Sequence, residues 1–127
     1  MEQYWQELQQ QVHRKAALER KQEALCEQWR KLKEELDTAT QRWQEEQKDV
    51  DKLEGISLAG IFSALSGRKE EQLEKERQEA QEALVQKEAA DNAFQKLEEE
   101  IRKNRDELFR LQDCEIKYQR ALEELSL

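Results

Sequence analysis

Apolar residues recur along two long segments of the chain at alternating spacings of three and four residues. In the first segment, heptad a positions from residue 8 to 50 and d positions from 4 to 53 are apolar at 11 of 15 sites. In the second, a positions from 73 to 122 and d positions from 76 to 125 are apolar at 12 of 16 sites. A pattern sustained over this length is typical of an α-helical coiled coil.

The signals that break helices are confined to the middle of the chain. The chain has no proline, and its only glycines are Gly55, Gly60 and Gly67. The sequence therefore predicts one domain over 1–127, with a helical arm at 2–54, a tip at 55–67 and a second arm at 68–126. The predicted fold class is all-α: a long antiparallel coiled-coil helical hairpin with a short helix at the tip.

The pairing of the two arms is predicted from the polar residues that interrupt the heptads. If facing residues have numbers that sum to 126, Gln22 lies opposite Asn104 and Gln11 lies opposite Glu115. In each of these two pairs, a polar interruption of one arm meets a polar interruption of the other. Neither pair then buries an unpaired amide against leucine. The same heptads also allow two extended chains to pair with each other by exchanging arms.

The tip contains apolar residues at the spacing of a short amphipathic helix, with Ser57 as its N-cap and Gly67 just past its end. This helix either covers the open end of the hairpin or docks on a partner. The residues predicted to form this surface are Ile56, Leu58, Ile61, Phe62 and Leu65.

Four apolar residues lie off the predicted heptad positions near the end of the hairpin that carries the termini: Trp5, Val12, Phe109 and Ile116. A two-helix hairpin leaves such residues exposed. They are therefore predicted to join hairpins into a homo-oligomer, a dimer or tetramer with a local four-helix bundle. Irregular packing at the edge of the seam is the alternative explanation.

Composition and charge exclude several classes of function. Acidic residues outnumber basic ones by 30 to 22, which gives a net charge of −8 and disfavours binding to nucleic acid. The longest apolar stretch, residues 56–65, is shorter than a membrane span, and its lack of a basic face disfavours membrane binding. The first residues do not resemble a signal peptide, so we expect a cytoplasmic protein.

The histidine and cysteine residues, which often act in catalysis or bind metals, do not form a cluster in the predicted hairpin. His13 is the only histidine, and neither cysteine lies near it in the predicted pairing. The predicted hairpin also keeps Cys26 and Cys114 too far apart for a disulfide. We therefore expect no catalytic residues, no metal site, no cofactor and no enzymatic activity.

The tip segment Lys52-Leu53-Glu54-Gly55-Ile56-Ser57-Leu58, followed by Phe62, Leu65 and 67–71, resembles a tip found in uncharacterised bacterial coiled-coil proteins. The resemblance covers about 20 residues and implies a coiled-coil hairpin with no known activity. In shape alone, the predicted hairpin is similar to those of prefoldin, phage-shock membrane-binding proteins and seryl-tRNA synthetase, whose functions are unrelated.

The sequence thus predicts a non-enzymatic coiled-coil scaffold or protein-interaction module that self-associates, with an unknown protein as a further partner. The alternative is a peripheral membrane protein that inserts its apolar tip helix.

Overall fold

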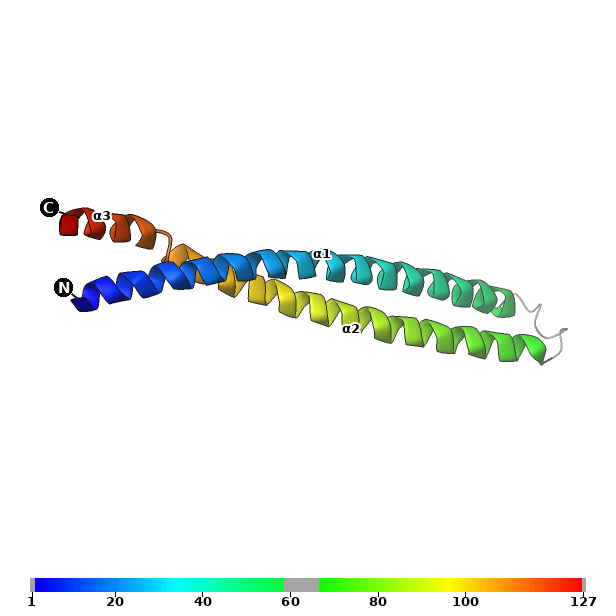
Figure 1. Cartoon of the computed structure of the whole chain (residues 1–127). Helices are drawn as coiled ribbons and strands as arrows, with labels where there is room; N and C mark the ends of the chain where they lie inside the picture. The colour runs from blue at the N-terminus through cyan, green and yellow to red at the C-terminus, as the bar shows by residue number, and fades with distance from the viewer. Residues whose placement is uncertain (1, 59–66, 127) are drawn as a thin grey trace. The chain divides into compact units, whose positions relative to one another are not determined.

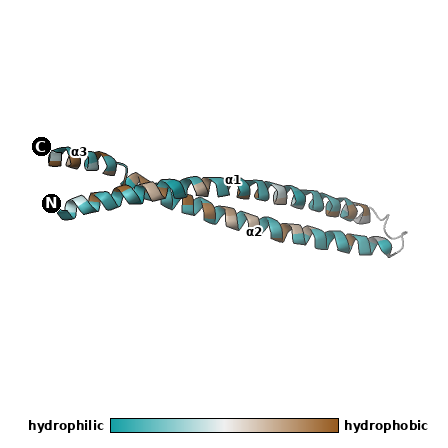
Figure 2. Ribbon diagram, viewed as in Figure 1, coloured by the Kyte–Doolittle hydropathy of each residue, from teal (hydrophilic) through white to brown (hydrophobic). Residues whose placement is uncertain are grey.

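The computed structural model describes residues 2–58 and 67–126, which form three helices. They are α1 (Glu2–Leu58), α2 (Arg68–Arg110) and α3 (Cys114–Ser126) (Figure 1). The described residues contain no strand, and α1 packs against α2 and α3 as a helical hairpin, so the predicted all-α class is confirmed. Apolar residues recur along all three helices between hydrophilic ones (Figure 2).

The chain forms two compact units. Unit 1 comprises residues 1–30 and 96–127, and unit 2 comprises residues 31–95. In unit 1, Arg14 pairs with Glu107 while Lys21, further along α1, pairs with Glu100, so the two arms are antiparallel. In unit 2, Arg42 bonds Gln86, and Glu54 pairs with Arg77, which shows the same antiparallel order.

The first helix is longer than predicted at its C-terminal end. We expected the arm to end at Glu54 and Ser57 to cap a separate tip helix, but α1 continues through Gly55 and Ser57 to Leu58. One glycine inside a helix costs only about 1 kcal/mol, which a helix of this length tolerates. At the other side of the tip, the Gly67 carbonyl accepts a hydrogen bond from the Glu71 amide at 3.2 Å and so begins α2.

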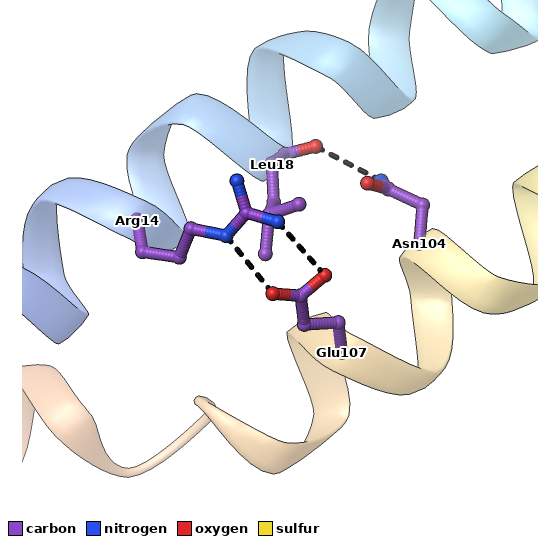
Figure 3. Close-up of polar contacts among 4 residues, drawn as sticks. All are labelled: Arg14, Leu18, Asn104 and Glu107. Atoms are coloured by element: carbon purple, nitrogen blue, oxygen red, sulfur yellow. Dashed lines mark hydrogen bonds and ion pairs between the residues drawn. The ribbon is translucent and has the colours of Figure 1, made fainter.

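Unit 1 confirms the predicted pairing of Gln22 with Asn104. The Asn104 side-chain nitrogen donates to Gln22 Oε1 at 2.8 Å and to the Leu18 carbonyl at 3.0 Å. Figure 3 shows the second of these bonds beside the Arg14–Glu107 pair. Asn104 is only 4% exposed, and its Oδ1 accepts no hydrogen bond from any described residue. One buried amide therefore fixes the register, at the cost of an unpaired acceptor.

The seam between the arms departs from a continuous heptad repeat near the termini. Towards the N-terminus, the side chains of α1 that are buried or half-buried shift by one position, to Val12 and Trp5 in place of Gln11 and Tyr4. In the second arm, Cys114 and Ala121 are buried or half-buried in place of Glu115 and Leu122. The numbers of facing residues still sum to 126, as for Val12 with Cys114 and Trp5 with Ala121, because both arms shift at the same level. The predicted pairing of Gln11 with Glu115 is therefore wrong.

The shift coincides with a break in the second arm, which was predicted to be one continuous helix over 68–126. Three hydrogen bonds of the i→i+3 type surround residues 111–113: from Leu111 N to the Leu108 carbonyl, from Gln112 N to the Phe109 carbonyl and from Cys114 N to the Leu111 carbonyl. Such bonds wind the backbone more tightly than an α-helix. The tighter winding brings residues 108, 111 and 114, spaced three apart, onto the seam, and α2 ends and α3 begins here.

Unit 2 combines large residues on α1 with small ones on α2. Ala80 and Ala83 of α2 are buried at 6% and 1% exposure, while Trp43 of α1 is half-buried. The Lys87 ammonium lies 4.8 Å from the centre of the Trp43 ring, in cation–π geometry. Small alanine side chains on one helix leave room for the bulky tryptophan on the other.

Replacing Asn104 with leucine should raise the free energy of unfolding by about 1–2 kcal/mol, because it removes a buried unpaired acceptor and adds apolar surface to the seam. Urea denaturation followed by circular dichroism at 222 nm measures this change. Asn104→Ala is the control and should destabilise the protein, since it leaves a cavity. A loss of stability in Asn104→Leu would contradict our account of this site.

Candidate interaction surfaces

The predicted tip surface is only partly covered by the structure. Ile61, Phe62 and Leu65 lie outside the described residues, and of Leu58 only the backbone, at the end of α1, is described. Ile56 lies on α1 and is 37% exposed. The tip therefore stays a prediction as a docking surface.

The four residues predicted to form the oligomer interface separate into two pairs. Phe109 on α2 and Ile116 on α3 are 68% and 54% exposed, as expected for residues off the seam. Trp5 and Val12 are half-buried on the seam of the hairpin itself, so their predicted off-seam placement is wrong. The Trp5 ring stacks on Tyr118, with centroids 4.9 Å apart and planes at 21°. Such a stack contributes about 0.5–1.5 kcal/mol to the packing of α1 against α3.

Exposed apolar residues concentrate in unit 1. Five of the seven large hydrophobic side chains that are exposed in the described part of the chain belong to this unit: Tyr4, Phe109, Ile116, Leu122 and Leu125. Sequence analysis placed Tyr4, Leu122 and Leu125 on the seam and thereby missed their exposure. The shift to Trp5 and Ala121 turns Tyr4 and Leu122 away from the seam. Single exposed leucines are ordinary on protein surfaces, so these five residues are candidates for an interaction surface only where they lie together.

A hollow of about 230 Å³ lies at the end of unit 1, where the described parts of α1 and α3 begin and end. We call it the end hollow, and its lining combines aromatic, aliphatic and acidic side chains from both helices: Glu2, Tyr4, Trp5, Ala121, Glu124 and Leu125. An unbroken heptad repeat does not predict this hollow, because only the shifted seam brings Trp5 next to Ala121.

Charged contacts flank the seam of unit 1. Arg14 makes a two-pronged contact with Glu107, from Nε to Oε1 at 2.9 Å and from Nη2 to Oε2 at 3.2 Å (Figure 3). This hydrogen bonding lowers the pKa of Glu107 below its ordinary value. The Lys15 ammonium lies 3.3 Å from Glu115 and 3.6 Å from Glu19, and its pKa is raised chiefly by the hydrogen bond to Glu115. These pairs orient side chains around the seam and add little net stability at exposed sites.

Three carboxylates gather in unit 2 and are the group in the described residues that best suits a metal ion. One oxygen each from Glu46, Asp49 and Glu76 lies within 4.8 Å of the others. Desolvation, followed by repulsion from Glu79, Asp49 and Glu46, raises the pKa of Glu76. Hard oxygen donors of this kind suit Ca²⁺ or Mg²⁺, but acidic clusters on helix surfaces are common without an ion.

The remaining residues of chemical interest lie apart. His13 is exposed on α1. Cys26 and Cys114 are both free thiols, the first exposed and the second buried at 3% exposure beside the break between α2 and α3. Burial of Cys114 was missed because the unbroken heptad placed Glu115 on the seam.

Comparisons with models of protein families, with curated proteins and with solved structures found no match. Within residues 2–58 and 67–126, no helix combines the length and apolar character needed to cross a membrane.

Replacing Glu76 with glutamine should raise the melting temperature at pH 7. The folded-state pKa of Glu76 is raised, so its carboxylate destabilises the fold above that pKa, and protonation relieves the effect as the pH falls. The gain from Glu76→Gln should therefore shrink as the pH falls through the folded-state pKa, which lies above the ordinary value of 4.5, and should be lost below 4.5. Thermal melts at pH 7 and at pH 4 or below measure both effects.

Glu82→Gln is the matched control, because Glu82 is an exposed carboxylate on the same helix and outside the cluster. An equal gain in both variants would show that net charge, and not the cluster, limits stability.

Proposed function

We propose that this chain is a non-enzymatic coiled-coil interaction module that self-associates through the outer face of unit 1. The observation that carries the proposal is the exposure of Phe109 and Ile116, at 68% and 54%, on either side of the break between α2 and α3. Burying two such side chains against a second copy removes a large apolar area from water, at about 25 cal/mol per Å².

The geometry of a two-helix hairpin supports this kind of association. Each helix buries one stripe against its partner and leaves its outer face to solvent, so two hairpins that meet on their outer faces form a four-helix bundle. In this proposal, Trp5 and Val12 support the contact between copies without forming it. They pack α1 against the second arm and so hold Phe109 and Ile116 on a firm support.

The charged groups of the chain also favour an interaction module over an enzyme. The shifted pKa values in unit 1 come chiefly from hydrogen bonds within ion pairs on its surface, and the raised pKa of Glu76 in the acidic cluster of unit 2 comes chiefly from desolvation. Two free thiols suit a reducing compartment, so we place the protein in the cytoplasm as part of the proposal.

The test is the mass of the protein in solution, measured by light scattering coupled to size exclusion over a series of concentrations. The parent should have a mass of at least twice 15.2 kDa, and Ile116→Glu should reduce it to the monomer with its helical content unchanged. A charge at this position would be buried without a partner in the contact between copies.

Val85→Glu is the matched control, because Val85 is 55% exposed on α2 in unit 2, against 54% for Ile116 in unit 1. It should leave the mass unchanged. A monomeric parent, or a parent that Val85→Glu dissociates as completely as Ile116→Glu does, would overturn the proposed contact.

A further inference from the structure

The end hollow has a floor that is fixed before any partner binds. Trp5 is held by its stack on Tyr118, so its ring does not need to be ordered on binding. Around it, Tyr4 and Leu125 are 54% and 64% exposed and offer apolar surface at the mouth of the hollow. Preorganised aromatic surface of this kind binds with a small loss of conformational entropy.

The rim of the hollow is acidic. Glu2 and Glu124 both line it, and neither forms an ion pair with another described residue. The surrounding segments, 2–12 and 113–126, contain six acidic residues and two basic ones. The local charge is therefore negative at the point where aromatic surface is exposed.

This combination selects a cation with an apolar stem. The face of an aromatic ring attracts ammonium and guanidinium groups, and carboxylates on the rim add charge-assisted hydrogen bonds. The methylene stem of a lysine or arginine would cover Ala121 and Leu125 while its charged end reaches Glu2 or Glu124. A second copy that met the hollow with its own hollow would set Glu2 and Glu124 against the same carboxylates, and an anionic lipid surface would also be repelled.

We propose that the end hollow binds a basic amphipathic helix of another protein, with a lysine or arginine side chain over Trp5 and leucine-type residues on Tyr4 and Leu125. A helix fits because α1 and α3 both line the hollow, so that residues three or four apart on a bound helix can contact Tyr4 on one and Leu125 on the other. This site is separate from the proposed self-association contact, which uses Phe109 and Ile116.

The test uses the full-length chain and a fluorescently labelled peptide of leucine and lysine in an amphipathic helical pattern, about 16 residues long so that it can be helical when bound. A peptide in which glutamate replaces every lysine is the control ligand. Fluorescence anisotropy at physiological salt should show binding of the basic peptide and none of the acidic one.

Two pairs of substitutions separate the hollow from general attraction to an acidic protein. Glu2→Gln/Glu124→Gln should weaken binding of the basic peptide about tenfold. Glu23→Gln/Glu98→Gln removes the same charge from exposed sites of unit 1 away from the hollow and should change affinity by less than about twofold. Leu125→Ser should weaken binding without changing the charge.

Three results would overturn the proposal: equal weakening by both charge pairs, no effect of Leu125→Ser, or loss of self-association in Glu2→Gln/Glu124→Gln, which would show that a second copy covers the hollow. Ile116→Glu separates the two proposals. A monomeric Ile116→Glu variant that still binds the basic peptide supports this site whatever the parent's oligomeric state.

Discussion

The structure of unit 1 depends on one buried amide. Asn104 donates to Gln22 and to the Leu18 carbonyl across the seam, and a slip of one heptad either way would set the Gln22 amide against Leu97 or Leu111. Aliphatic residues alone would tolerate a slip of one heptad, because leucine packs against leucine at many levels. The positions of Trp5 against Tyr118, of the ion pairs beside the seam and of the end hollow all follow from this choice of register.

The sequence was sufficient to predict the all-α class and the pairing of Gln22 with Asn104, because both depend on long periodic patterns and on matched polar interruptions. It did not lead us to the break at 111–113, because we treated Gln11 and Glu115 as polar interruptions of an unbroken repeat. The signal was present in their neighbours. Val12 and Cys114 are apolar, and their numbers sum to 126, so they face each other across the seam. Each lies three residues from the next seam position, and this spacing can be recognised only when both arms are compared.

The same shift decides which residues are available to partners. It brings Trp5 and Val12 into the seam and leaves Tyr4, Leu122 and Leu125 exposed, while Phe109 and Ile116 stay outside in either arrangement. An interaction surface on a two-helix hairpin is thus set by small rotations of each helix about its axis. Hydrophobicity alone identified the candidate residues, and the local winding of the backbone determines which of them are buried in the seam and which are exposed.

The paired shift also constrains how this fold can change in length. One added residue in α1 between Leu18 and Gln22 would rotate the preceding part of the helix by about 100°, so that Trp5, Leu8 and Val12 would leave the seam. Only a matching addition between Asn104 and Leu108 would restore the contacts. Insertions and deletions in unit 1 should therefore be accepted in evolution as complementary pairs, one in each arm, and a designer who shortens this hairpin must cut both arms at the same level.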